Sequence, residues 1–373
     1  MKKCMKLISL VAVAIFMVVA FTACNRDDNG GPGAAGAFTA NDIQVALVAH
    51  SPESILFDGS FNEGAWDGIN RFLARHNVPA GNAQFFQPHV GDDEARINLV
   101  ADAVEQGANI IVLPGFHFIA SSYTMQAMFP DVKFVLLDAS PAGEIAPNLA
   151  AIHYAEEQSG FLAGYAIVME GHRTLGFMGG NPVPAVVRFG HGFLQGAEYA
   201  AASLGLAPGD VTVHFHYVGS FMPSPEVAIM AGAWFEMNDI EVIFAAAGGA
   251  GFSVMSAAET SGGLVIGVDV DQSAQNDTVI TSAMKALAVS VDDMLTDFLN
   301  GEFRGGQAHM FNASINGIAL PMETSRFQNF TQAQYDAIFA QLADGSIVVN
   351  NIVTPTVSEA NLGLTLVTVI EVN

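Results

Sequence analysis

The chain has 373 residues, a formal net charge of −24 and an apolar content of 51%. A strongly acidic chain repels the phosphate backbone, so we do not expect nucleic acid as a partner. Its two cysteines, Cys4 and Cys24, lie close to the N-terminus, which excludes a disulfide or a cysteine metal site in the rest of the chain. The length favours two domains, and the apolar content is sufficient for a large core.

The first segment has the pattern of an export signal. Three lysines precede an apolar run over residues 7–21, and two small residues separate this run from Cys24. The order resembles a bacterial lipoprotein signal, with residues 1–23 removed, Cys24 lipidated and a flexible leash over residues 24–41. Phe21 stands where such signals usually have leucine. The alternative is a transmembrane anchor, but the run is shorter than the ~20 residues that span a bilayer. We therefore expect a chain that is anchored to the cell membrane by acyl groups on the extracytoplasmic face.

From residue 43 onward, short apolar strands alternate with helix-length amphipathic segments, which is typical of α/β proteins. The predicted strands are 43–49, 110–113, 134–137, 174–177, 211–217, 242–246 and 265–268. The predicted helices are 60–75, 92–106, 156–170, 185–203, 225–237, 251–260 and 283–300. Because the strands are continuously apolar, we expect parallel strands with helices on both faces of each sheet. Two such arrays follow each other, and the change falls near His153.

Ligands of open α/β sheets bind beyond the carboxyl ends of the strands. The residues that follow the predicted strands are mainly acids, aromatics and glycines, with few cations. A phosphate site would need a glycine-rich turn with a cation, so this pattern better suits a neutral, hydroxylated ligand with an aromatic face. Lys133 and Lys285 are the only lysines after residue 6, and Lys285 lies in a mostly apolar stretch. A cation in such a place needs a partner or a ligand.

These segments resemble the basic membrane lipoprotein family, the nucleoside-binding substrate-binding proteins of ABC transporters. Two of them are Asp58-Gly-Ser-Phe-Asn-Glu-Gly-Ala-Trp-Asp-Gly and Val265-Ile-Gly-Val-Asp-Val-Asp-Gln. The other matching segments are 45–48, 134–139, 157–165, 176–180, 189–196, 246–251 and 281–285. The resemblance implies an α/β, type I periplasmic-binding fold, in which two Rossmann-like lobes are joined by a three-stranded hinge and enclose the ligand. The implied limits are 42–152 plus about 283–315 for one lobe, and 153–282 plus about 316–373 for the other.

The same resemblance implies which aromatic residues bind the ligand. Phe61 would stack on one face of a nucleobase, and Asn62 belongs to the same motif and is a further candidate contact. Phe221 is the candidate for the second face, with Phe189 as the alternative. Base stacking tolerates different bases. Each of these phenylalanines could instead belong to the core.

The polar candidates are acids, one lysine and two glycines. Asp138 would accept hydrogen bonds from a purine edge, because a carboxylate only accepts. Asp269 would bind ribose hydroxyls, whereas strand alternation directs Asp271 to the other face. Lys285 would reach ribose oxygens or pair with Asp269. Gly248 and Gly249 would let the backbone approach the sugar. A capping, turn or purely structural ion-pair role is the alternative for each of these residues.

One position departs from the family pattern. His50 stands where the family usually has aspartate, and the loop between it and Asp58 is longer than usual. A histidine both donates and accepts, and we expect the charge of His50 to change near pH ~6.5. The class of ligand is therefore open at this position. His117 is expected near the same cleft.

The leading hypothesis is a monomeric binding lipoprotein that delivers a purine nucleoside, such as inosine, guanosine or adenosine, to an ABC transporter permease. A receptor of the same fold for a sugar or an autoinducer is the near alternative. A secreted nucleoside hydrolase would need clustered carboxylates with a metal, or an acid and a base flanking the glycosidic bond. A structural or adhesive surface lipoprotein is a third class. We expect no enzyme activity, no cofactor and no metal.

Overall fold

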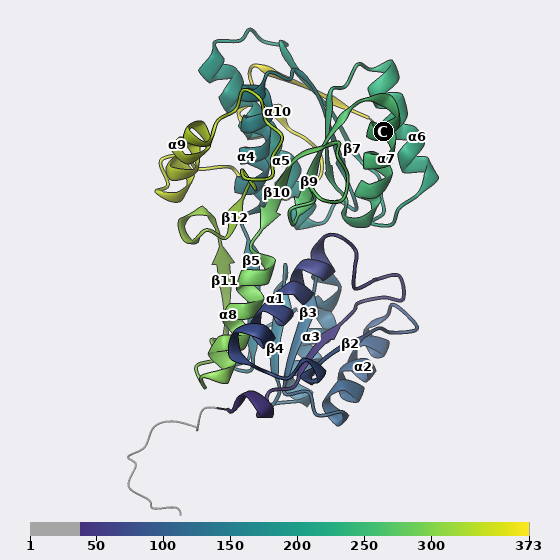
Figure 1. Ribbon diagram of the computed structural model, residues 1–373, viewed down its shortest axis with the longest axis vertical. Coiled ribbons are helices and arrows are strands. Elements are labelled where there is room, and N and C mark those ends of the chain that lie inside the picture. Colours follow the sequence, from purple (N-terminus) through teal and green to yellow (C-terminus); the bar gives the residue numbers. More distant parts are fainter. Residues whose placement is uncertain (1–37, 373) are drawn as a thin grey trace, which may run out of the picture. The chain divides into compact units, whose positions relative to one another are not determined.

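The computed structural model describes residues 38–372, in which strands and helices alternate (Figure 1). The predicted signal, the lipidation site Cys24 and the leash up to residue 37 lie outside the described residues. Phe38 donates its backbone N–H to the Leu299 carbonyl at 3.2 Å, and its ring packs against Phe298. Among residues 38–372, no helix combines the length and the apolar character that a membrane crossing requires.

The strands form two sheets. The first sheet contains β1 (Val45–Val48), β2 (Ala83–Phe86), β3 (Ile110–Pro114), β4 (Lys133–Leu137), β5 (Leu149–Tyr154) and β11 (Gln307–Phe311). The second contains β6 (Thr174–Gly179), β7 (Val211–Tyr217), β8 (Val242–Ala246), β9 (Leu264–Asp269), β10 (Val279–Lys285), β12 (Ile318–Ala319) and β13 (Val367–Glu371). We call the first sheet with its helices lobe 1 and the second sheet with its helices lobe 2.

The two sheets share one strand order. It runs β2-β1-β3-β4-β5-β11 in lobe 1 and β7-β6-β8-β9-β10-β12 in lobe 2, where β13 adds a further strand beside β7. Within the described residues all paired strands are parallel except β10 and β12. This is the doubly wound arrangement expected from the continuously apolar strands. It makes β4 and β9 equivalent strands of the two lobes.

Helices cover both faces of each sheet, as Figure 1 shows. In lobe 1, α1 (Phe61–His76) and α8 (Leu287–Leu299) pack on one face, and α2 (Asp93–Glu105) and α3 (Ile119–Met128) pack on the other. In lobe 2, α4 (Glu156–Glu170) and α5 (Pro184–Leu204) oppose α6 (Pro225–Met237) and α7 (Gly251–Ser261). The helix α9 (Gln332–Ala343) and the short α10 (Glu359–Leu362) add to the core beside α4 and α5.

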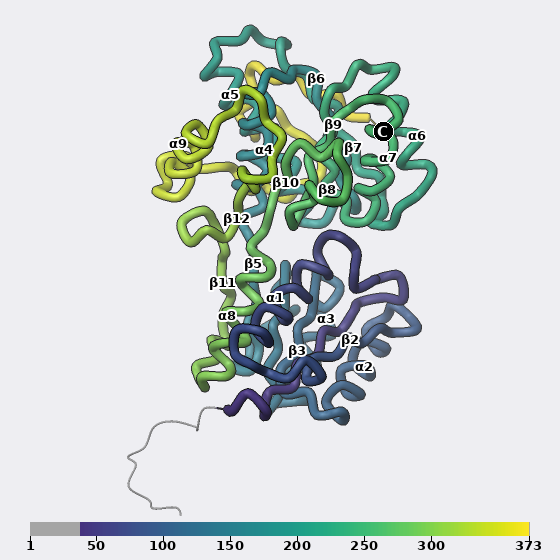
Figure 2. The backbone as a smooth tube through the Cα atoms, viewed as in Figure 1, coloured from purple at the N-terminus to yellow at the C-terminus, as the bar shows by residue number. Residues whose placement is uncertain are grey.

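The chain passes between the two sheets three times, after β5, after β10 and between β11 and β12 (Figure 2). The predicted three-stranded hinge is therefore confirmed. The helix predicted over 283–300 begins too early, because residues up to Lys285 belong to β10, which pairs with β9. Helix α8 begins only at Leu287. The residue limits predicted for the two lobes stay predictions.

Helices α4 and α5 pack backbone against backbone. A Cβ atom built on Gly160 or Gly164 of α4 would overlap a carbonyl oxygen of α5. The same holds in reverse for Gly192 and Gly196 of α5, which face carbonyl oxygens of α4. Only glycine permits this approach. The close packing places the N-terminal ends of both helices side by side, next to the hinge.

Candidate functional site

The residues predicted to contact a ligand all line one cavity, of about 400 Å³, between the two lobes. They are His50, Phe61, Asn62, Asp138, Phe221, Gly248, Gly249, Asp269 and Lys285. The volume falls in the range of ~300–1,000 Å³ that is usual for small-molecule sites. The structure thus brings these residues together, while their roles toward a ligand stay predictions. Phe189 and His117, the other candidates, line the same cavity.

Two aspartates reach the cavity from the ends of equivalent strands. Asp138 follows β4 and Asp269 ends β9, so both lie at the carboxyl edge of their sheets. Their backbones are left-handed, with φ of 57° and 69°. Such a conformation costs non-glycine residues roughly 1–3 kcal/mol and gathers at functional sites. Asp271 does not line the cavity but accepts a hydrogen bond from Thr324 at 2.6 Å. Strand alternation is not the reason, because residues two apart share one face of a strand. Strand β9 ends at Asp269, whose left-handed backbone ends the regular alternation before Asp271.

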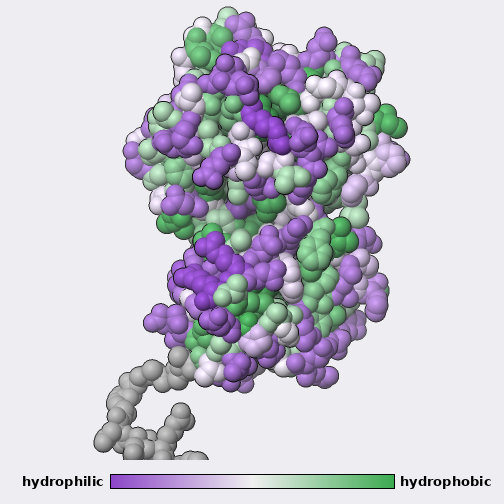
Figure 3. Space-filling view, viewed as in Figure 1, coloured by the Kyte–Doolittle hydropathy of each residue, from purple (hydrophilic) through white to green (hydrophobic). Residues whose placement is uncertain are grey.

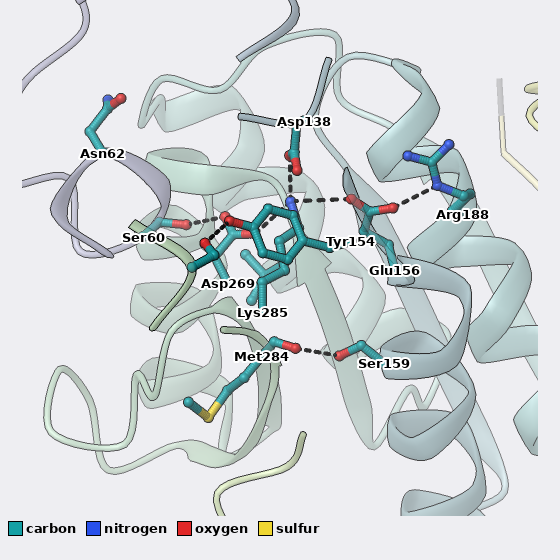
Figure 4. Close-up of polar contacts among 12 residues, drawn as sticks. Ser60, Asn62, Asp138, Tyr154, Glu156, Ser159, Arg188, Asp269, Met284 and Lys285 are labelled. Carbon is teal, nitrogen blue, oxygen red and sulfur yellow. Dashed lines mark hydrogen bonds and ion pairs between the residues drawn. The ribbon is translucent and has the colours of Figure 1, made fainter. Parts of the chain in front are cut away.

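Lys285 connects the two aspartates (Figure 4). Its Nζ lies 2.6 Å from Asp138 Oδ2 and 3.3 Å from Asp269 Oδ1. Glu156, at the start of α4, is 3.6 Å from the same nitrogen. The predicted pairing of Lys285 with Asp269 is present, and the shorter contact is with Asp138. Lys285 is 4% exposed, so these carboxylates provide the partners that a buried ammonium needs.

Aromatic rings surround the same ammonium. Lys285 Nζ lies 4.8 Å from the centre of the Phe61 ring, 5.3 Å from Phe189 and 5.6 Å from Tyr154. These distances are within the range of cation–π attraction. The Tyr154 hydroxyl is 2.6 Å from Ser290 Oγ, which holds that ring in place. Phe61 therefore lines the site, and it also packs against the core of lobe 1.

A second ion pair lies behind the first. Arg188 of α5 donates from Nε to Glu156 Oε2 at 2.6 Å, and it lies 3.9 Å from Glu157. Glu156 thus joins Arg188 to Lys285 (Figure 4). Sequence reasoning missed Tyr154, Glu156 and Arg188. Arg188 could have been found, because a single arginine in the apolar stretch of α5 needs a partner.

The cluster shifts the proton affinity of its members. Burial raises the pKa of Asp138 to about 7, while Lys285 lowers it and Glu156 and Asp269 raise it. Burial disfavours the charge of Lys285, but the three carboxylates outweigh it and raise the pKa of Lys285 above its usual value. The three carboxylates thus favour the charged form of Lys285, and burial favours the protonated form of Asp138.

Besides Glu156 Oε1, which lies outside the cavity, two buried polar atoms of the site have no hydrogen-bond partner among the described residues: Asp138 Oδ1 and Asn62 Oδ1. The Asn62 amide donates to the Ile55 carbonyl at 3.2 Å, and its side chain stands apart from the lysine cluster in Figure 4. Buried polar atoms are nearly always paired. These two oxygens are therefore candidate acceptors for a ligand's N–H or O–H groups.

The segment before α1 positions Phe61, the first residue of that helix, and contacts lobe 2. The Asp58 carboxylate accepts backbone N–H groups from Ser60, Asn62 and Glu63, so it caps the helix, and burial raises its pKa to about 6. Ser60 Oγ donates to Asp269 Oδ2 at 2.7 Å. These contacts link the position of Phe61 to the aspartate of the opposite lobe.

Two glycines leave space for the ring of Phe221, the second candidate for stacking on a base. A Cβ atom on Gly180 would overlap the ring of Phe221, and one on Gly248 would lie 3.6 Å from it. Gly248 also has a φ of 53°, which favours glycine. At the edge of the cavity, Ile55 is 53% exposed and Met222 is 42% exposed. Figure 3 shows small hydrophobic patches (green) among hydrophilic side chains on this face of the molecule.

The prediction that His50 changes charge near pH 6.5 is wrong. Its ring stacks on His117 with 4.0 Å between centres and a 4° angle between planes. Burial lowers the pKa of His50 to about 3, with help from His117 and Arg96. Burial likewise lowers the pKa of His117 to about 4. Both imidazoles are neutral at physiological pH. In the part of the chain that the structure describes, no cluster of three or more histidines, cysteines or acids could hold a metal.

Residues 44–351 match the family described as ABC transporter substrate-binding protein PnrA-like, or Bmp. The chain belongs to this family. Among curated Bmp relatives, it is 26% identical to the ABC transporter nucleoside-binding protein BmpA of Lactococcus lactis, over 94% of this chain and 99% of that one. It is also 26% identical to basic membrane protein A1 of Borrelia garinii, over 80% of this chain and 83% of that one.

The fold of this Bmp protein is also that of solved binding proteins. It resembles an ABC transporter solute-binding protein from Aeropyrum pernix, with a TM-score of 0.71, 19% identity, and coverage of 83% of this chain and 94% of that one. The Bmp chain is therefore a solute-binding protein of an ABC transporter with the type I periplasmic-binding fold. The family consists of non-enzymatic binding proteins, so the hydrolase alternative is wrong. Membership of the basic membrane protein family suggests that the solute is bound on the extracytoplasmic side.

Proposed function

We propose that this protein captures a purine nucleoside in the cavity between its lobes and delivers it to the permease of its ABC transporter. The observation that carries this proposal is that both lobes supply aromatic rings and carboxylates to a single cavity, which Phe61 and Phe221 enter from opposite lobes. Phe61 and Asp138 come from lobe 1, and Phe221 and Asp269 come from lobe 2. A ligand with an aromatic base and a hydroxylated sugar satisfies both kinds of group.

The base is assigned to Phe61, Phe221 and Asp138. Base–aromatic stacking contributes ~1–3 kcal/mol per base and does not require a particular base. The unpartnered Oδ1 of Asp138 accepts an N–H from the base edge. The ribose is assigned to Asp269 and Lys285. Asn62 and the backbone at Gly248 and Gly249 are the further contacts, and His50 supplies a neutral polar edge.

The charge of the cavity supports a nucleoside over a nucleotide. Among residues 38–372, Lys285 is the only lysine or arginine that lines the cavity, and it is already bound to carboxylates. A phosphate would meet Asp138 and Asp269 without a free cation to balance it. The Lactococcus relative, whose name gives it as nucleoside-binding, supports the same choice.

The membrane attachment is part of the proposal. Cys24, in its lipoprotein-like context, would carry the lipid that anchors the binding protein beside the permease, and the protein would act as a monomer. Two acyl chains suffice for stable anchoring, at ~0.8 kcal/mol per buried methylene. Mass spectrometry of the chain purified from membranes tests this part, since acylation adds the mass of the lipid to a fragment that begins at Cys24.

Isothermal titration calorimetry tests the ligand. The full chain is purified in mild detergent and refolded from denaturant to remove bound ligand, and is then titrated with inosine, guanosine, adenosine, cytidine and ribose. We expect heat with at least one purine nucleoside and none with ribose. Heat with ribose alone would favour the sugar-receptor alternative, and the absence of heat with every nucleoside would refute the proposed ligand class.

A further inference from the structure

The buried cluster around Lys285 contains more carboxylates than cations. Lys285 contacts Asp138, Asp269 and Glu156, and Arg188 contacts Glu156 and Glu157. An unbalanced negative charge is costly in the interior of a protein. Where carboxylates crowd together in this way, one of them holds a proton at a higher pH than it would in water.

Asp138 is the member of the cluster whose proton a ligand can replace. It lines the cavity, its Oδ2 accepts from Lys285, and its Oδ1 has no partner among the described residues. Both oxygens of Asp269 are engaged, Oδ1 by Lys285 at 3.3 Å and Oδ2 by the Ser60 hydroxyl at 2.7 Å. Glu156 Oε1 also has no hydrogen-bond partner among the described residues, but Glu156 does not line the cavity, so a ligand cannot reach it. A proton on Asp138 therefore resides on Oδ1.

We propose that Asp138 releases this proton when the site binds a base that donates an N–H, and keeps it when the base offers only a nitrogen acceptor. In the first case the Oδ1–H bond breaks, the proton passes to the solvent buffer, and the carboxylate accepts the N–H of the base. In the second case the carboxyl group donates its proton to the ring nitrogen in a hydrogen bond. This inference rests on the proposed function and adds that pH selects between two classes of purine nucleoside.

The surroundings of Asp138 agree with this exchange. His50 and Asp58 line the same cavity, and burial raises the pKa of Asp58 to about 6. The titratable and charged groups on the elements packed around Asp138 are His117, His153, Tyr154, Glu156, Glu157, Arg188, Asp269 and Lys285. Burial lowers the pKa of both histidines and raises that of the tyrosine, so these three stay neutral near pH 7. Burial raises the pKa of Asp138 to about 7, so its acid and its anion coexist at neutral pH.

The binding affinity changes with pH in opposite directions for the two classes of base. An N–H donor stabilises the carboxylate and lowers the pKa of Asp138 in the complex. Its affinity therefore rises as the pH increases toward 7 and then becomes constant. An acceptor base stabilises the protonated form and raises the pKa of Asp138 in the complex. Its affinity is therefore constant below pH 7 and falls as the pH increases above it.

Inosine and purine riboside are matched probes for this test. Inosine carries an N–H at the ring position where purine riboside has only a nitrogen acceptor, and the sugars are identical. The refolded full chain is titrated with each by calorimetry from pH 5.5 to 8.5. We expect the inosine affinity to rise by up to about tenfold per pH unit below pH 7, and that of purine riboside to fall by the same factor above it. At pH 7, inosine heats should differ between phosphate and Tris buffers, because the buffer takes up the released proton.

Two substitutions assign the proton. Asp138→Asn should remove the pH dependence for both probes, because an amide neither gains nor loses a proton in this range. Glu157→Gln is the matched control, since burial raises the pKa of Glu157 also to about 7 but the residue does not line the cavity. This variant should keep the pH dependence of the parent. If Asp138→Asn does not fold, the comparison of the two buffers on the parent decides the question alone.

The outcomes separate this inference from the proposed function. Inosine that binds with the same affinity and buffer-independent heat from pH 5.5 to 8.5 overturns the inference and leaves the proposed function intact. A pH dependence that survives in Asp138→Asn, or disappears in Glu157→Gln, also overturns the inference. Absence of binding by every nucleoside at every pH overturns the proposed function, and the inference falls with it.

Discussion

Asp138 and Asp269 occupy equivalent positions in the two lobes and bind the same ammonium group. Each stands at the carboxyl end of the fourth strand of its lobe, β4 or β9, with a left-handed backbone. Lys285 Nζ lies 2.6 Å from the first and 3.3 Å from the second. Lys285 itself ends β10, one of the strands that leads into the hinge. The ammonium group of Lys285 thus joins the aspartates of the two lobes across the cavity.

Phe61→Ala should weaken nucleoside binding by about tenfold or more, because the base loses one stacking face worth ~1–3 kcal/mol. Phe57→Ala is the matched control, since Phe57 lies on the loop that leads into α1, is 69% exposed and does not line the cavity. Calorimetry with the best nucleoside measures both variants. Equal losses in the two variants would show that Phe61 acts through the loop and not through the base.

Lys285→Met should destabilise the protein, because it leaves Asp138, Asp269 and Glu156 without their shared cation. Removing one partner of a buried ion pair typically costs ~3–5 kcal/mol. Lys133→Met, at the start of β4, serves as the comparison, because Lys133 is only half-buried and does not line the cavity. Urea unfolding at pH 8 measures the free energy of unfolding. A Lys285→Met variant as stable as the parent would show that the three carboxylates do not need the charge of Lys285.

Gly196→Ala should force α4 and α5 apart, since its Cβ would overlap the Phe161 carbonyl oxygen. Overpacking of this kind costs ~1–3 kcal/mol. Gly232→Ala in α6 is the opposite case, because nothing lies within 4 Å of the added Cβ. That change should stabilise the protein by up to ~1 kcal/mol through helix propensity. Thermal unfolding of both variants, followed by circular dichroism, tests the pair.

His50→Gln should make the protein less sensitive to acid. Burial lowers the folded-state pKa of His50 from 6.5 to about 3, so below pH 6.5 the unfolded chain binds more protons and the folded state loses stability. The variant lacks this loss, so its stability relative to the parent should increase as the pH falls from 7.5 to 5. Urea midpoints at the two pH values measure the difference. The exposed His89→Gln is the control, and an equal shift there would contradict the account of His50.

The positions of the site residues could be predicted because they follow strand ends. Parallel strands bring their carboxyl ends to one edge of a sheet, so Gly248 and Asp269 lie at the same edge in lobe 2. Asp138 lies at the equivalent edge of lobe 1 and lines the same cavity. The predicted strands are all present, and most of them are largely apolar runs, whereas β7 alternates apolar with polar residues. Strands β2 and β11 were missed because their exposed or half-buried positions leave no such run.

Only one partner of a site residue was predicted, the pairing of Lys285 with Asp269. The two nearest acids of Lys285 were candidates, but its third contact, Glu156, was interpreted only as part of a helix start. The charge of His50 was predicted from its usual pKa, and only the fold shows that its ring is buried against His117. The beginning of α8 was predicted too early. Residues up to Lys285 form β10 because they pair with β9, and the local sequence pattern does not show this pairing.

A crystal structure of the full chain with inosine tests the central claim most directly. The account predicts the base between Phe61 and Phe221, an N–H of the base on Asp138, and ribose hydroxyls on Asp269 and Lys285. Inosine bound outside this cavity, or a cavity that stays empty of inosine while another solute fills it, would contradict the account.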